Sequence, residues 1–184
     1  MIETAASIWA TIVDEFSDIP DAAQATRIVL RLAMAILLGA AIGYERELRG
    51  KAAGLRTHML VSLGAAIFIL VPLQRDMPVA DASRVLQGII AGIGFLGAGA
   101  IIKLSDHGRI KGLTTAASIW VAAAIGIAAG MGLEATAVVS TLAALFILVV
   151  VGRLENNIDK EEKTKDNAEP RRPDQERKNR DGST

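Results

Sequence analysis

The stretch GYERELRGKAAGLRTHML (residues 43–60) places six charged side chains between two apolar runs. The run before it is LRLAMAILLGAAIG (residues 30–43), and the run after it is VSLGAAIFILVPL (residues 61–73). A membrane-crossing helix needs about 20 predominantly apolar residues. With the residues next to them, the two runs extend to Ile28–Tyr44 and Leu55–Leu73 and come close to this length. The stretch therefore indicates a charged loop at a membrane surface, joining two membrane-spanning helices.

Composition excludes several classes of protein. The chain of 184 residues contains no cysteine, so it has no disulfide framework and no thiolate metal site. Its formal net charge is zero, which argues against nucleic acid as a partner. The N-terminus carries acidic residues in place of the basic region of a signal peptide, so no cleavable signal peptide is expected.

The apolar stretches predict an all-α, polytopic membrane protein with about five transmembrane helices. We expect three regions: an N-terminal segment (1–26), a transmembrane domain (27–153) and a charged tail (154–184). The predicted spans are Ile28–Tyr44, Leu55–Leu73, Val85–Ile102, Leu113–Met131 and Leu133–Gly152.

Two interpretations stay open for each flanking region. In the N-terminal segment, apolar residues at helical spacing (Ile8, Trp9, Ile12, Val13 and Phe16) fit either a helix lying flat on the membrane or a loosely ordered leader. The tail has few large apolar residues and alternating charges, which is typical of disorder. The tail is either a solubilising terminus or a segment that binds a partner or lipid headgroups.

Basic residues predict the orientation, because cytoplasmic loops carry an excess of Lys and Arg. The 45–56 loop, the 103–112 loop and the tail are rich in these residues. We therefore expect the N-terminus outside and the C-terminus in the cytoplasm.

An internal similarity appears when the sequence is shifted by 58 residues. Leu38-Gly39-Ala40 then falls on Leu96-Gly97-Ala98, and Gly54-Leu55 falls on Gly112-Leu113. The similarity predicts two helical hairpins of the same orientation, related by an axis along the membrane normal, followed by a fifth span. Their cytoplasmic loops would be equivalent.

The third span, LQGIIAGIGFLGAGAII (residues 86–102), is rich in glycine. Gly88 and Gly92 form a GxxxG pair, which predicts close packing against another helix through Gly88, Gly92 and Gly99. A bent helix that exposes carbonyl groups to a polar cavity is the alternative. Polar residues near span ends are expected to hydrogen-bond neighbouring helices; they are Gln87, Thr114, Thr115 and Ser118.

Charges at membrane depth are costly and usually find partners. Arg31 either snorkels to the surface or serves a function. Glu45 and Arg49 lie four residues apart and can pair if the helix continues, while Arg46 would point toward the second hairpin. Lys103 falls on Glu45 in the repeat and is a candidate partner. The cluster is either a buried network or a solvated interfacial group.

No chemistry is assigned to the two histidines, His58 and His107, because neither belongs to a set with ligand spacing. The sequence shows no phosphate-binding loop, no HExxH motif and no Ser/His/Asp arrangement. We therefore expect no catalytic residues and no enzymatic activity.

Three strings together resemble the MgtC/SapB family of bacterial inner-membrane proteins: GAAIGYERELRGKAAGLRTHMLVSLGAA, QGIIAGIGFLGAGAII and IKGLTTAASIWVAAAIGIAAG. The resemblance runs from about Arg31 to Arg153. It implies functional roles for residues of the family's motifs and of the polar positions above: Arg31, Glu45, Arg46, Arg49, Arg56, Thr57, Gln87, Gly92, Gly94, Phe95, Gly97, Gly99, Lys103, Thr114, Thr115 and Trp120.

The resemblance implies a polytopic protein of the bacterial inner membrane, associated with magnesium transport or homeostasis. Some family members look more like regulators that bind another integral membrane protein and transport nothing. Many members carry a folded cytosolic domain, whereas this chain has only its charged tail after Arg153. We expect no cofactor apart from a candidate interaction with Mg2+, whose ligands are unknown. The expected partners are the lipid bilayer and either another membrane protein or further copies of the chain.

Overall fold

The computed structural model describes residues 2–15, 21–75, 77–104 and 111–154, and every secondary-structure element in these ranges is a helix. Two compact units divide the chain, residues 1–145 and residues 146–184. Five helical segments are long and apolar enough to cross a membrane, which confirms the predicted fold class. The predicted charged tail falls on residues 155–184 and lies outside the described residues.

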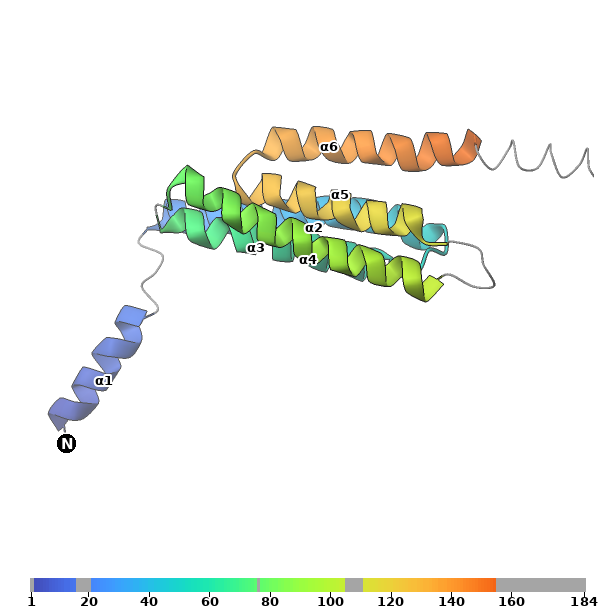
Figure 1. The fold of residues 1–184 in the computed structure, drawn as a ribbon. Helices are drawn as coiled ribbons and strands as arrows, with labels where there is room; N and C mark the ends of the chain where they lie inside the picture. Colours follow the sequence, from blue (N-terminus) through green and yellow to red (C-terminus); the bar gives the residue numbers. More distant parts are fainter. Residues whose placement is uncertain (1, 16–20, 76, 105–110, 155–184) are drawn as a thin grey trace, which may run out of the picture. The chain divides into compact units, whose positions relative to one another are not determined.

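The first unit contains α1 (Ile2–Glu15) and four long helices of two hairpins. The hairpins are α2 (Ala22–Leu48) with α3 (Leu55–Gln74), and α4 (Val79–Leu104) with α5 (Leu113–Gly130). Figure 1 shows α2 and α4 running in one direction and α3 and α5 in the other. Leu55 and Leu113, the first residues of α3 and α5, are 58 positions apart, as the repeat predicts.

Helix α2 begins six residues before the predicted first span. Asp21 is its N-cap, and the side-chain Oδ1 accepts a hydrogen bond of 2.6 Å from the Gln24 backbone N–H. An aspartate at this position satisfies a helix-end donor and so stabilises the first turn. Residues 22–27, which lie before the predicted span, therefore form the first turns of α2.

Helix α3 is the centre of the first unit, because it packs extensively against both α2 and α5. Glycines allow the backbones of α2 and α5 to come close to the backbone of α3. A Cβ on Gly39 of α2 would lie 2.7 Å from the His58 carbonyl oxygen, and a Cβ on Gly130 of α5 would lie 2.5 Å from the Ala66 carbonyl oxygen. Each helix repeats the glycine four residues away, at Gly43 and Gly126. Small residues at this spacing let helix backbones come together in a bilayer.

Helix α4 packs mainly on α5 and less on α3. A Cβ on Gly97 would lie 3.5 Å from the Ala116 Cβ, which is an ordinary contact. At Gly88, Gly92 and Gly99, a Cβ would meet nothing within 4 Å. The prediction that these three glycines pack the third span against another helix is therefore wrong within the described part of this chain, because no other helix approaches them closely.

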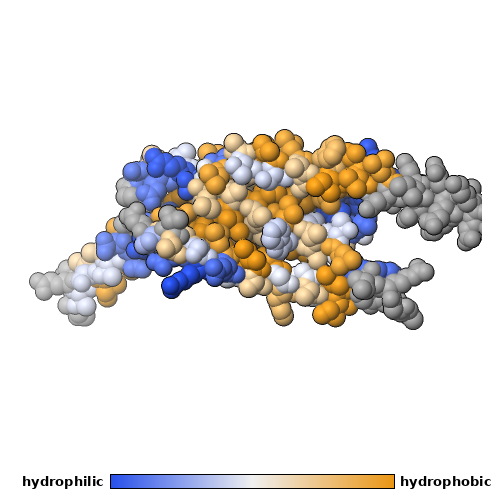
Figure 2. All heavy atoms as spheres, turned by 45° about the horizontal axis from the view of Figure 1, so that its top comes forward, coloured by the Kyte–Doolittle hydropathy of each residue, from blue (hydrophilic) through white to orange (hydrophobic). Residues whose placement is uncertain are grey.

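The surface of these helices is apolar along its middle. Figure 2 shows hydrophobic side chains over the body of the bundle and hydrophilic ones gathered toward its ends. An open apolar groove of about 680 Å³ lies between α3 and α4, lined by residues that include Val61, Phe68, Gly88 and Gly92. This distribution is expected for helices surrounded by lipid.

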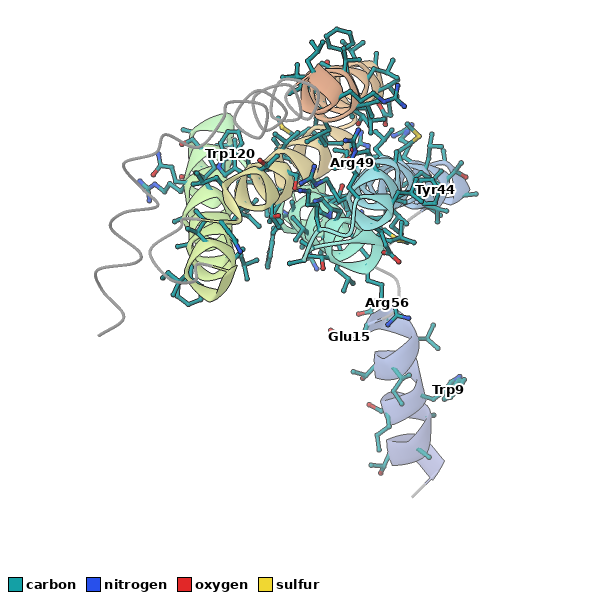
Figure 3. All side chains as sticks on the ribbon, turned by 90° about the vertical axis from the view of Figure 1, so that its right-hand side faces the viewer. Trp9, Glu15, Tyr44, Arg49, Arg56 and Trp120 are labelled. Atoms are coloured by element: carbon teal, nitrogen blue, oxygen red, sulfur yellow. The ribbon has the colours of Figure 1, made fainter. Side chains whose placement is uncertain are left out.

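The predicted amphipathic N-terminal segment forms α1 through Glu15, while Phe16 lies outside the described residues. The side chains of Ile8, Trp9, Ile12 and Val13 are exposed, and Trp9 points away from the helix axis (Figure 3). Helix α6 (Glu134–Phe146) follows α5 after a turn at Gly132, whose φ is 79°. Residue Phe146 starts the second unit, which continues as the π-helical segment η1 (Ile147–Val151).

Candidate functional site

The C-terminal turn of α2 carries a partly enclosed ion network. Arg49 Nε lies 2.7 Å from Glu45 Oε1, and Arg46 Nη1 lies 3.5 Å from Glu45 Oε2. Glu45 is 8% exposed and Arg46 only 2%, so both are buried. The expected Glu45–Arg49 pair is confirmed, because α2 continues to Leu48 and brings both residues onto one face. In Figure 3, Arg49 lies at the bundle, whereas Tyr44 and Arg56 point away from it.

A hydrogen-bonded turn at Gly50 ends α2 directly after this ion network. Gly50 adopts φ 61°, a left-handed conformation that glycine reaches without steric cost, and its N–H donates to the Glu47 carbonyl. The Lys51 N–H donates to the Arg46 carbonyl at 3.0 Å. Carbonyl groups at the helix end are thereby satisfied. The turn holds Arg46 and Arg49 in place relative to the loop that follows.

Glu47 joins the end of α2 to the start of α3. Gly54, the N-cap of α3, has no side chain to accept a hydrogen bond. The Leu55 backbone N–H instead donates to Glu47 Oε2 at 2.8 Å. A carboxylate at a helix N-terminus also interacts favourably with the helix dipole. Glu47 is thus a capping residue supplied from the neighbouring helix, a role that its sequence position alone does not predict.

A buried polar network connects α3 to α5. The His58 side chain is fully buried; its Nδ1 lies 2.8 Å from the Gly54 carbonyl oxygen and its Nε2 lies 3.0 Å from Ser118 Oγ. The carbonyl can only accept, so Nδ1 donates to it. The same Ser118 oxygen lies 2.8 Å from the Thr115 carbonyl oxygen, so the one hydroxyl proton is shared between this carbonyl and His58 Nε2. Hydrogen bonds of this kind hold helices together inside a membrane.

A basic cavity opens where the two hairpin loops approach one another. It has a volume of about 410 Å³. Its lining combines the end of α2, the loop after it and the first turn of α5: Arg46, Gly50, Lys51, Ala52, Lys111, Gly112, Thr114 and Thr115. We call this space the basic cavity. Arg46 therefore faces the second hairpin, as expected.

The remaining predicted residues lie apart from this cavity. Arg31 is at the opposite end of α2, where its Nη1 donates to the Gly130 carbonyl oxygen at 3.4 Å. A cation at the C-terminus of α5 is favourable for the helix dipole. The Lys103 side chain lies outside the described residues, so its pairing with Glu45 stays a prediction. Of the other predicted site residues on α3, α4 and α5, Gly97 is buried. The exposed ones are Arg56, Thr57, Gln87, Gly92, Gly94, Phe95, Gly99 and Trp120.

Sequence reasoning missed the role of the residues buried on α3. His58, Ser62, Ala65 and Ile69 follow helical spacing and form one face. Small and polar residues repeated at this spacing are a signal of a buried face. Within the described residues, no group of three or more His, Cys, Asp or Glu side chains is placed to hold a metal ion.

The model of the MgtC family matches residues 32–157 of this chain. Three relatives illustrate the similarity. SrpB of Synechococcus elongatus is 46% identical over 102 residues, which cover 50% of this chain and 56% of SrpB. YhiD of Escherichia coli K12, by its name a candidate magnesium transporter, is 41% identical over 133 residues, covering 68% of this chain and 61% of YhiD.

MgtC of Salmonella typhimurium is 47% identical over 94 residues, which cover 50% of this chain and 38% of MgtC. The chain thus spans about 38–61% of the length of these relatives. No solved structure matches the chain significantly.

Proposed function

The chain belongs to the MgtC family and is a multi-pass membrane protein, and from this premise we propose that it acts in Mg2+ homeostasis in a bacterial inner membrane. The observation that carries the proposal is the family match, which begins in α2 and extends past η1. The name of the relative YhiD supports the connection with magnesium. The proposal assigns no enzymatic activity to the chain.

We propose the orientation from the distribution of charge. The end of the bundle that carries Arg46, Arg49, Lys51 and Lys111 would face the cytoplasm, because basic residues are retained on that side. An odd number of spans then places the N-terminus outside and the C-terminus inside. The basic cavity would consequently open toward the cytoplasm.

A regulatory role is the second candidate, and the state of Glu45 favours it over transport. Specific Mg2+ sites usually use carboxylate oxygens together with retained waters. The Glu45 carboxylate is already engaged by two guanidinium groups, at 2.7 Å and 3.5 Å. A cation would have to displace Arg49 or Arg46 to reach it. A protein that binds another integral membrane protein needs no such displacement.

The Ser118–His58 pair has the spacing of a nucleophile and its base, but its surroundings favour a structural role. Ser118 is 3% exposed and His58 is fully buried. The second ring nitrogen of His58 is directed to a backbone carbonyl oxygen, where a catalytic histidine is usually oriented by a carboxylate. We therefore assign this pair to helix packing.

Two measurements test the proposal. In a strain that lacks the chain, growth at limiting Mg2+ and total cell Mg2+ should change and should be restored by the wild-type chain. Unchanged growth and Mg2+ content would overturn the role in homeostasis. Mg2+ flux into proteoliposomes then separates the two candidates. Flux that is lost in Glu45→Gln but kept in Glu47→Gln supports transport, whereas no flux supports regulation.

A further inference from the structure

Arg46 is buried without enough partners for its charge. Its guanidinium has one contact, from Nη1 to Glu45 Oε2 at 3.5 Å, while Nε and Nη2 make no hydrogen bond to any described residue. The side chain is 3% exposed. Burying unsatisfied charged donors destabilises a fold considerably, so such a group usually has a further partner. Arg46 lines the basic cavity, which is where such a partner can lie.

The N-terminus of α5 lines the same cavity. Gly112 is its N-cap, adopts φ 89° and provides no side-chain acceptor for the first turn. The first intrahelical N–H bond comes from Ala116 to the Gly112 carbonyl, which leaves the preceding N–H groups of that turn without helical partners. Thr114 and Thr115 add two hydroxyl groups to the lining. Helix N-termini with free N–H groups bind anions readily.

Two lysines complete the lining, one from each hairpin loop. Lys51 follows α2, and Lys111 precedes α5. The neighbouring carboxylate, Glu45, already pairs with Arg49 at 2.7 Å and so leaves the cavity with an excess of positive charge. Among the described residues that line the cavity, none is acidic. The excess charge would repel Mg2+ and attract an anion.

We propose that the basic cavity binds the phosphoryl group of a phosphate-containing anion, held by Arg46, Lys51, Lys111 and the N-terminus of α5. A tetrahedral oxyanion suits this lining, because its oxygens can accept simultaneously from guanidinium, ammonium, hydroxyl and backbone N–H donors. The volume of about 410 Å³ falls within the range of about 300–1,000 Å³ typical of small-ligand pockets. The site therefore has room for a substituent on the phosphoryl group. This inference does not depend on the role in Mg2+ homeostasis.

Two sources can supply this chemistry, a soluble phosphate compound and the headgroup of an anionic phospholipid. The first arm of the test measures thermal unfolding of the purified full chain in detergent free of phospholipid, with inorganic phosphate added against chloride of equal ionic strength. A bound ligand raises the unfolding temperature as its concentration exceeds Kd. The second arm repeats the measurement in nanodiscs of phosphatidylcholine with and without phosphatidylglycerol.

Lys111→Gln and Lys51→Gln are the test variants, because both side chains are exposed and their replacement should leave the fold intact. Each should weaken binding about tenfold or more, as expected when one charge-assisted hydrogen bond is lost. Arg56→Gln is the control, because Arg56 is an exposed cation near the same loop that does not line the cavity. It should bind as the wild type does.

Stabilisation by phosphate that depends on both lysines supports a soluble ligand. Stabilisation only by phosphatidylglycerol, with the same dependence, supports a lipid headgroup. The proposal is overturned if neither phosphate nor phosphatidylglycerol stabilises the wild type. It is equally overturned if Arg56→Gln loses as much binding as Lys111→Gln, because the effect would then be one of general surface charge.

Discussion

The two hairpins share a sequence pattern but differ in how closely their helices approach. Gly39 in α2 and Gly97 in α4 occupy equivalent positions, and so do their neighbours His58 and Ala116. A Cβ on Gly39 would lie 2.7 Å from the His58 carbonyl oxygen, whereas a Cβ on Gly97 would lie 3.5 Å from the Ala116 Cβ. The repeat therefore preserves which residues face each other and changes the distance between the backbones.

This difference shows that glycines alone do not predict close packing. The third span is the segment richest in glycine, yet most of its glycines face open space. The close approaches occur at Gly39, Gly43, Gly126 and Gly130, which all contact α3. Helix α3 is thus the core of the first unit, and α4 contributes an open face.

The largest expected loss of stability follows from breaking the ion network of the first hairpin. Among the described residues, the second hairpin has no counterpart to this network. Glu45→Gln keeps the size of the side chain and leaves two guanidinium groups, those of Arg46 and Arg49, without their carboxylate. Breaking a buried ion pair commonly costs about 3–5 kcal/mol. We expect a loss of this order in the free energy of unfolding, measured by reversible denaturation in mixed micelles.

Glu47→Gln is the matched control for this change. Glu47 is exposed, and a glutamine oxygen can still accept the hydrogen bond from the Leu55 N–H. We expect a change within about 0.5 kcal/mol, as for most surface substitutions. Equal effects of the two substitutions would contradict a buried network and would leave the charges as a solvated interfacial group.

The next effect tests the close contact between α3 and α5. A Cβ on Gly126 would overlap the Ser62 backbone carbonyl, which cannot move without shifting the helix. Gly126→Ala should therefore lower the free energy of unfolding by about 1–3 kcal/mol, the usual range for overpacking. Gly64→Ala is the control, because a Cβ there meets nothing within 4 Å. A Gly126→Ala variant as stable as Gly64→Ala would refute the close approach.

A smaller effect is expected at the hydrogen bond between the same two helices. Ser118→Ala removes the hydroxyl that lies 3.0 Å from His58 Nε2 and leaves a buried ring nitrogen without a partner. Leaving a buried polar group unsatisfied costs about 1–3 kcal/mol in soluble proteins, and less where a bilayer also surrounds the unfolded helices. Thermal unfolding should show a loss near the lower end of that range. Full stability of Ser118→Ala would mean that this bond contributes nothing.

The smallest effect is expected on the open face of α4. Gly92→Leu should be tolerated as well as Ile90→Leu, because both positions are exposed and a Cβ on Gly92 would meet nothing within 4 Å. The unfolding temperatures of the two detergent-solubilised variants should agree. A marked loss in Gly92→Leu alone would show that this face packs against another chain.

The helices could be predicted from the sequence because their apolar length is a property of single segments. Leu55 and Leu113 begin α3 and α5 as predicted, since each follows a glycine and starts an apolar run. The Glu45–Arg49 ion pair could also be predicted from the sequence, because helical spacing alone brings the two side chains together.

The packing of α3 could not be predicted in this way. Which face of α4 meets α5 depends on the relative rotation of helices that are all apolar, and a hydrophobic pattern carries little information about it in lipid. The roles of Ser62 and Ser118 depend on contacts with residues about 60 positions away. The basic cavity likewise requires Arg46 of the first hairpin and Lys111 of the second to line the same space.

Paired substitution at the equivalent glycines tests the central claim most directly. In Gly39→Ala the new methyl group would overlap the His58 carbonyl, whereas in Gly97→Ala it would make an ordinary contact with Ala116. The free energy of unfolding should therefore fall by about 1–3 kcal/mol in Gly39→Ala. It should stay the same or rise slightly in Gly97→Ala, because alanine favours a helix by up to about 1 kcal/mol over glycine. Equal losses at both positions, or a larger loss at Gly97, would contradict the account of one tight and one open hairpin.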